Sequence, residues 1–286
     1  MTASPASERL QRADGALGLR FDAAHGTTRL ADLYQRDPCR TLLPEPDPGE
    51  PRTAVLITTA GGLTGGDRLD VKIAVDASAV ALCTPQAAEK IYRSPGNPAV
   101  IDIGLTVAPG AALEWLPQEM ILFDGARLKR SVTLDLAGDA RLLAGDITVF
   151  GRTARGERFT AGELSDRWRL RRDGRLLWTD ATRLSDDILS RLDHPAGFDG
   201  AVAQGLILYR GPEPAAARDR LRALLEAEDG EAADRTLAGA TVLDDLLLLR
   251  LLDRDAARLR RCFALLWAAL RPGLGLPGRM PRLWRL

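Results

Sequence analysis

The feature that most constrains this sequence is a regular alternation of apolar and polar residues across residues 54–209. Residues 69–75 and 101–107 are two clear examples, with an apolar side chain at every second position. Because successive side chains of a strand point to opposite faces, this period of two predicts half-buried β-strands. Glycine and proline interrupt the pattern at spacings too short for helices between the strands. We therefore expect the middle of the chain to be all β.

Residues 164–180 give the clearest hairpin signal in the chain. The pair Asp173-Gly174 suits the positive φ of a tight turn, and apolar residues lie symmetrically on either side of it. These residues are Trp168, Leu170, Leu176 and Trp178. Arg167, Arg169 and Arg171 alternate with them, and the pattern is typical of a solvated sheet face.

Two helices are predicted, both in the C-terminal third. Residues 214–228 begin with a proline, which favours the first turn of a helix, and carry leucines at helical spacing. Residues 255–270 have a stronger pattern, because one apolar stripe recurs at steps of three and four residues. The stripe consists of Ala256, Leu259, Phe263, Leu266 and Leu270.

The chain is expected to form one domain over residues 1–286, with residues 1–16 as a loose tail. The one linker-like stretch, residues 43–51, is rich in proline and acidic residues. A boundary there would leave an N-terminal piece too short to bury a core, so we interpret the stretch as an exposed loop.

The balance of charge argues against nucleic acid or an anionic membrane as a partner. The 286 residues contain 39 basic and 39 acidic side chains, so no net field attracts the molecule to either. The most apolar run, residues 246–252, contains Arg250 and is far shorter than the ~20 residues that span a bilayer. We interpret it as a buried strand.

Other features favour the cytoplasm. The first 20 residues lack the apolar stretch of a signal peptide. The three cysteines, Cys39, Cys83 and Cys262, are far apart and form neither a disulfide framework nor a metal-binding pair, which fits a reducing compartment.

Motifs of enzymatic chemistry are missing from the sequence. The glycine-rich segment 61–67 is followed by a strand pattern, whereas a phosphate-binding loop needs a helix there, so we interpret it as a pair of turns. His25 and His194 are the only histidines, and neither lies in a catalytic motif. A tight zinc or nickel site is also unexpected, because such sites draw on several His or Cys ligands. We therefore expect no tightly bound cofactor.

Acidic residues near predicted strand ends are the remaining chemical resource. They are Asp67, Glu119, Asp124, Asp146, Glu157 and Asp180. Capping of turns explains any one of them. A pair of carboxylates on a β scaffold is also what a carbohydrate-cleaving enzyme uses, and this enzyme alternative stays open at this point.

Several motifs together resemble the UreD (UreH) family of urease accessory proteins, over roughly residues 17–284. The first two are Gly-Gly-Leu-Thr-Gly-Gly-Asp at 61–67 and Thr-Pro-Gln-Ala-Ala-Glu-Lys-Ile-Tyr-Arg at 84–93. In the same order follow residues 113–119, 123–126, 150–157, Arg271-Pro272 and 281–284. Five or more ordered motifs are much more specific than one glycine-rich turn.

The resemblance implies a mainly β fold, a β-helix-like stack of sheets with two flanking α-helices. It also implies a cytoplasmic, non-enzymatic scaffold in a hetero-oligomer with apo-urease subunits, UreF and the GTPase UreG. Such a scaffold assists nickel delivery to the urease active site. The predicted helices are our expected docking surface, because amphipathic helices often supply one.

The resemblance further implies a transient passage of nickel(II) through the protein along acidic side chains. Oxygen ligands in small number hold a divalent ion loosely enough to release it. The candidates are Asp67, Asp146 and Asp180, followed by Glu119 and Glu157. Two positions depart from the pattern that the resemblance leads us to expect: Glu89 replaces a small residue, and Ala144 stands where an acid would fit.

Overall fold

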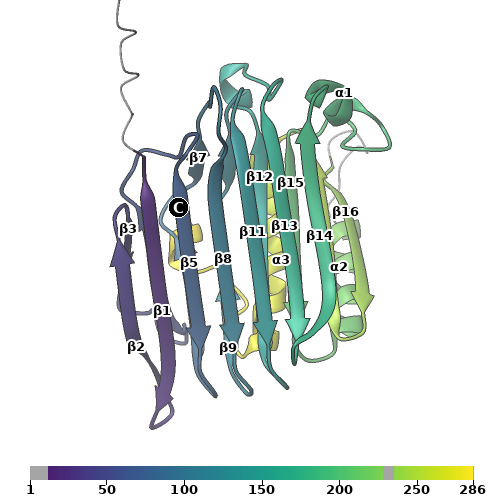
Figure 1. Cartoon of the computed structure of the whole chain (residues 1–286). Helices are drawn as coiled ribbons and strands as arrows, with labels where there is room; N and C mark the ends of the chain where they lie inside the picture. Colours follow the sequence, from purple (N-terminus) through teal and green to yellow (C-terminus); the bar gives the residue numbers. More distant parts are fainter. Residues whose placement is uncertain (1–11, 228–234, 286) are drawn as a thin grey trace, which may run out of the picture.

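The computed structural model describes residues 12–227 and 235–285, which form two stacked β-sheets with helices on one outer face (Figure 1). The first sheet contains β1 (Asp14–Ala24), β2 (Thr27–Arg36), β5 (Arg68–Val75), β8 (Ala99–Val107), β11 (Arg127–Leu136), β13 (Glu163–Arg172) and β14 (Arg175–Ser185). The second contains β3 (Cys39–Leu42), β4 (Arg52–Thr58), β6 (Val80–Pro85), β7 (Glu89–Ile91), β9 (Ala112–Trp115), β10 (Met120–Leu122), β12 (Arg141–Phe150), β15 (Ala203–Arg210), β16 (Leu237–Leu243) and β17 (Leu246–Asp253).

The chain winds between the two sheets as a β-solenoid of about four turns. Strands β4, β6, β9 and β12 stack in parallel in one sheet, and β5, β8, β11 and β13 stack in parallel in the other. Antiparallel strands extend both sheets at their ends. The prediction of a β-helix-like stack is confirmed.

The two long helices cover the outer face of the second sheet. Helices α2 (Pro214–Ala227) and α3 (Ala256–Leu270) match the two predicted segments, and Asp255 caps α3 by accepting a hydrogen bond from the backbone N of Arg258 (2.8 Å). Glu228, the predicted last residue of the first helix, lies outside the described residues. A short helix, α1 (Ile188–Asp193), was not predicted. None of the described helices is long and apolar enough to span a bilayer.

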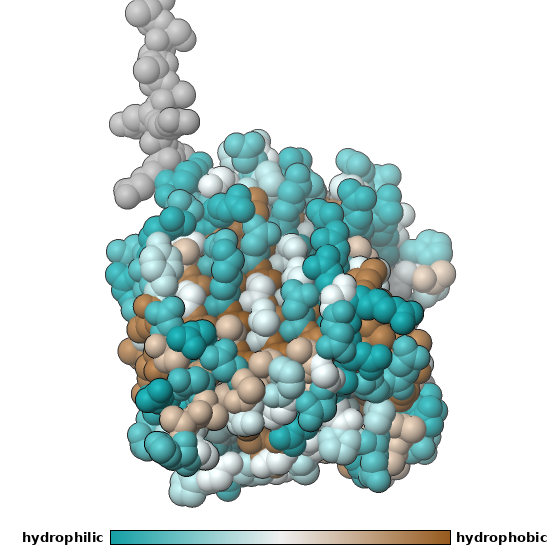
Figure 2. Space-filling model, turned by 60° about the horizontal axis from the view of Figure 1, so that its bottom comes forward, coloured by the Kyte–Doolittle hydropathy of each residue, from teal (hydrophilic) through white to brown (hydrophobic). Residues whose placement is uncertain are grey.

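Two apolar clusters hold these layers together. One fills the space between the sheets and includes Phe21, Leu105 and Trp168; the other joins the second sheet to α2 and α3 and includes Phe263 and Trp267. The outer face of the first sheet is solvated instead: Arg167, Arg169 and Arg171 are exposed there, as predicted. Hydrophilic residues cover most of the face shown in Figure 2, with hydrophobic residues visible between them.

The predicted hairpin exists, but its register was wrong beyond the turn. Asp173 and Gly174 both have positive φ, and Leu170 pairs with Trp178. A bulge next to Leu170 shifts the pairing by one residue, so that Leu176 faces solvent with 53% of its surface exposed. One extra residue in a strand moves every side chain beyond it to the opposite face of the sheet. A prediction that pairs residues symmetrically about the turn cannot show such a bulge.

The predicted N-terminal tail, residues 1–16, extends too far into the first strand. Strand β1 begins at Asp14, so residues 14–16 belong to the first sheet. Residues 1–11 of the predicted tail lie outside the described residues.

A buried ionic cluster attaches the C-terminal segment to the second sheet. Arg271, at the end of α3, is fully buried and donates from Nε to Glu114 Oε1 of β9 (2.8 Å). It also pairs with Glu50 of the loop 43–51, and Trp267 Nε1 donates to Glu114 Oε1 (2.7 Å). The loop that was predicted to be exposed is therefore tied to the core by its last acid.

Candidate functional site

Three buried charged side chains meet between the two sheets. Arg130 of β11 donates from Nε to Asp166 Oδ1 of β13 (2.9 Å) and from Nη1 to Asp146 Oδ1 of β12 (2.9 Å). Its Nη2 contacts the second oxygen of each carboxylate, at 2.6 Å for Asp166. Because Asp146 belongs to the other sheet, the arginine bridges the two layers. We call these three residues the Arg130 triad.

Strand alternation explains why the triad points inward. Arg130 is in phase with Leu128 and Val132 on the buried face of β11, and it lies beside Asp166 in the parallel ladder of β11 and β13. Asp166 in turn is in phase with Trp168 on β13. The Arg130 guanidinium lies 5.9 Å from the centre of the Trp168 ring, which forms one wall of the site.

The triad carries a net charge of minus one in a region nearly closed to water. The side chains of Arg130, Asp146 and Asp166 are 6%, 7% and 6% exposed. Burial by itself lowers the pKa of Arg130, but the charges and hydrogen bonds of the two aspartates outweigh it and raise the pKa well above its usual value. Arg130 therefore stays a cation, and Thr148 Oγ1 gives Asp146 a further hydrogen bond (3.2 Å).

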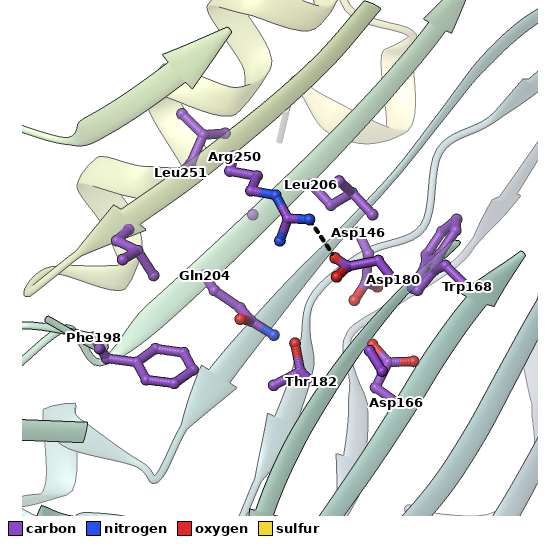
Figure 3. Close-up of a pocket in the computed structure, with 14 residues that line it drawn as sticks. Asp146, Asp166, Trp168, Asp180, Thr182, Phe198, Gln204, Leu206, Arg250 and Leu251 are labelled. Atoms are coloured by element: carbon purple, nitrogen blue, oxygen red, sulfur yellow. Dashed lines mark ion pairs between the residues drawn. The ribbon is translucent and has the colours of Figure 1, made fainter. Parts of the chain in front are cut away.

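On one side of the triad lies a cavity of about 290 Å³ that is lined by both polar and apolar side chains (Figure 3). Asp146, Asp166 and Trp168 form its inner end, and Thr182, Gln204 and Phe198 line its middle. Its outer rim carries Asp180 of β14, which pairs with Arg250 of β17 at 2.8 Å. The exposed fraction falls from 60% for Arg250 and 24% for Asp180 to 7% for Asp146, so carboxylates lead from solvent to the interior.

On the other side lies a second cavity of about 100 Å³, which is mostly apolar. It shares Asp146 and Trp168 with the first cavity, and Arg130 also lines it. Its polar groups include Glu89, Thr58, Gln118 and Cys39, and the exposed Ala87 and the half-buried Arg40 border it. The two cavities thus meet at the triad and together cross the space between the sheets.

Glu89 is the unusual acid of the second cavity. It accepts a hydrogen bond from Thr58 Oγ1 (3.0 Å), and within the part of the chain that the structure describes it has no ion-pair partner. Burial raises the pKa of its carboxyl, while the hydrogen bond from Thr58 lowers it to a smaller extent.

Two of the five predicted nickel-passage candidates share a cavity, and three lie elsewhere. Asp146 and Asp180 both line the first cavity. Asp67 accepts hydrogen bonds from the backbone N of Ala13 (2.8 Å) and of Thr64 (2.7 Å), which is a turn-capping arrangement. Glu119 pairs with Arg260, and Glu157 pairs with Arg152. Neither of them lines the two cavities.

Sequence reasoning missed Arg130, Asp166 and Glu89. The candidates were acids expected near strand ends or turns, which excluded the base Arg130 and Asp166, an acid within a predicted strand. A signal was present, because each is a charged residue in the apolar phase of an alternating strand, where burial requires a partner. Glu89 was noted only as a departure from a family pattern.

The geometry does not favour the enzyme alternative. Asp146 is held by Arg130 and Asp180 by Arg250, so the two cavity acids that the sequence singled out both carry a guanidinium partner. A glycosidase needs one carboxyl that is protonated and free to donate. Among the described residues, no group of three or more His, Cys, Asp or Glu side chains is arranged to hold a metal ion.

Comparison with known proteins identifies the family. Residues 13–285 match the family model described as UreD urease accessory protein. The chain is 44% identical over 274 residues to the urease accessory protein UreD of Magnetococcus marinus, covering 96% of this chain and 94% of that protein. It is 46% identical over 244 residues to the UreD of Granulibacter bethesdensis (85% and 99% covered) and 42% identical over 289 residues to UreD 3 of a Bradyrhizobium strain (99% of both). These names describe an accessory protein rather than an enzyme, and the chain belongs to the UreD family of urease accessory proteins.

Proposed function

We propose that this protein is a scaffold that binds apo-urease together with UreF and UreG and assists nickel delivery to the urease active site. Family membership supports the accessory role. The observation that carries the nickel step is the pair of cavities that meet at Asp146, with carboxylates from the solvent-facing rim inward. We infer a cytoplasmic hetero-oligomer, and the small number and wide spacing of the cysteines fit a reducing compartment.

The two cavities suit a cation that must be bound and then released. Carboxylate oxygens attract nickel(II), and a small number of them binds it weakly compared with a cage of histidines and cysteines. Asp180 at the rim and Asp146 at the inner end are therefore our leading passage residues. Asp67, Glu119 and Glu157 remain weaker candidates, because they lie outside these cavities.

The helical layer is our proposed docking surface, but its apolar stripe is not the part that docks. Leu221, Leu259 and Phe263 are buried against the second sheet. Leu265 is the apolar side chain of α3 that faces outward, with 39% of its surface exposed. Substitution of Leu265 tests docking without opening the core.

The test is co-expression with apo-urease subunits and the other accessory proteins, followed by measurement of nickel per urease active site. Omission of this chain should lower the nickel content while the urease subunits still assemble. Asp180→Asn should also lower it, whereas Asp135→Asn should not, because Asp135 is an acid of β11 with 47% of its side chain exposed, away from the cavities and the helices. Unchanged nickel without the chain would refute the delivery role, and equal effects of the two substitutions would refute the role of the cavity.

A further inference from the structure

The Arg130 triad separates the two cavities. Asp166 lines the first cavity, Arg130 lines the second, and Asp146 and Trp168 line both. The direct route for an ion from one cavity to the other therefore runs between these side chains. A positively charged guanidinium, held by both carboxylates, occupies that position.

A fixed guanidinium repels an incoming cation, and the repulsion is strong because the site is desolvated. The same position becomes favourable for a divalent cation if Arg130 leaves it. Asp146 and Asp166 then offer up to four carboxylate oxygens, and Thr148 Oγ1 lies 3.2 Å from one of those of Asp146. Two carboxylates with one divalent ion are neutral, whereas the triad has a net charge of minus one.

The second cavity offers the displaced guanidinium a new partner. Glu89 and Arg130 line the same space of about 100 Å³, and Glu89 has no ion pair among the described residues. An arginine side chain has several rotatable bonds, so its head group can turn while its backbone stays in β11.

We propose that Arg130 is a movable latch: a divalent cation from the Asp180 side replaces it between Asp146 and Asp166, and the guanidinium turns toward Glu89. This inference rests on the proposed nickel passage and adds an exchange step within it. After the exchange each charged group has a partner, because the cation neutralises the aspartates that Arg130 leaves and Arg130 pairs with Glu89.

The experiment titrates the purified full-length chain with nickel chloride by isothermal titration calorimetry. Asp146→Asn identifies the relevant site: the nickel-binding event that this substitution abolishes is the one compared between variants. Arg130→Lys keeps the positive charge but cannot form the four-contact bridge, so it should bind nickel about tenfold more tightly. Glu89→Gln removes the alternative partner of Arg130 and should weaken binding several-fold. Glu163→Gln, an acid at the start of β13 outside both cavities, should leave binding unchanged.

Two further measurements make the outcome decisive. The Arg130→Lys/Glu89→Gln double variant should bind nickel more tightly than the sum of the two single-variant changes in binding free energy predicts, because both residues act in one exchange. Diffraction at the nickel absorption edge should place the ion between Asp146 and Asp166. If Arg130→Lys does not fold, Glu89→Gln and the nickel position still test the latch.

Equal affinity of wild type, Arg130→Lys and Glu89→Gln would overturn the latch, as would nickel bound away from the triad. These results are separate from the proposed function. Nickel loading of urease that depends on this chain, together with unaltered binding in the variants, would refute the latch alone.

Discussion

Replacement of Arg271 by methionine should destabilise the protein strongly. Arg271 is fully buried and neutralises Glu114, which is also fully buried, and Glu50, whose side chain is 5% exposed. It also donates to the backbone carbonyls of Pro277 (3.0 Å) and Arg279. Methionine fills a similar volume without any of these contacts, so two carbonyls lose their donor. Among the described residues, Glu114 then keeps only the hydrogen bond from Trp267, and Glu50 keeps only the distant Arg279 (3.7 Å).

The size of the effect follows from the burial. Removal of one partner of a buried ion pair costs about 3–5 kcal/mol. For a chain of this length the entropy of unfolding is about 0.6 kcal/mol per degree, so the Tm should fall by about 5–8 °C.

The loss should also depend on pH. Burial raises the pKa of Glu114, and Arg271 and Trp267 partly oppose that effect. An acid whose folded pKa is raised above its unfolded pKa loses stability as pH rises between the two values. Without Arg271 the folded pKa rises further, so the difference in Tm between variant and wild type should be smaller at pH 5 than at pH 8.

Thermal unfolding followed by circular dichroism at the two pH values measures both effects. Arg282→Met is the control, because Arg282 is 78% exposed and approaches Asp47 only to 3.9 Å. A Tm of Arg271→Met within 2 °C of wild type at pH 8 would refute the claim that the buried cluster stabilises the C-terminal segment. A loss of equal size at both pH values would refute the assignment to Glu114.

Three other outcomes can be checked on the purified chain. Gly145→Ala should lower the Tm by a few degrees in the same melts, because an added Cβ would lie 2.6 Å from Leu206 O and 2.7 Å from Trp267 Cζ3. Overpacking of this kind costs about 1–3 kcal/mol, so an unchanged Tm would contradict this prediction. The three cysteines should resist alkylation by iodoacetamide at pH 8 until urea unfolds the chain, since all are buried and burial raises the pKa of Cys39 to about 11. Labelling of the native protein, detected by mass spectrometry, would contradict this prediction. The Tm of Glu89→Gln should rise relative to that of wild type as pH increases from 4.5, because burial raises the pKa of Glu89 in the folded protein, and the gain should level off above that pKa. A difference in Tm between the two proteins that stays constant from pH 4.5 to 8 would rule this out.

Local sequence was sufficient for the β-rich middle of the chain and for the two long helices, but not for the short helix α1. Period-two alternation marked strands such as β5 and β8, and the pattern of α3 matched its observed bounds to within one residue. The pair Asp173-Gly174 correctly marked the turn of the hairpin. These signals are reliable because each depends on side chains within one strand, helix or turn. The bulge beyond Leu170 was missed because it depends on the pairing with the neighbouring strand.

The stack of sheets and the family were predicted from the resemblance to known proteins. Neither that resemblance nor local sequence predicted which arginines pair with the acidic residues. Asp146 and Asp180 were selected as acids near predicted strand ends, whereas both lie within strands. Nothing in their local sequence indicates that each faces an arginine more than 15 residues away. Asp67 looked equivalent to them and proved to cap a turn.

The sequence by itself determined that the middle of the chain is all β, where the two long helices lie and, through its motifs, which family the chain resembles. Only the tertiary structure decided that Arg130, Asp146 and Asp166 meet and that two cavities meet at them. The physical reason is that β-solenoid winding brings together strands from successive turns and from both sheets. Contacts between those strands depend on the number of residues in every intervening turn, which no local pattern encodes.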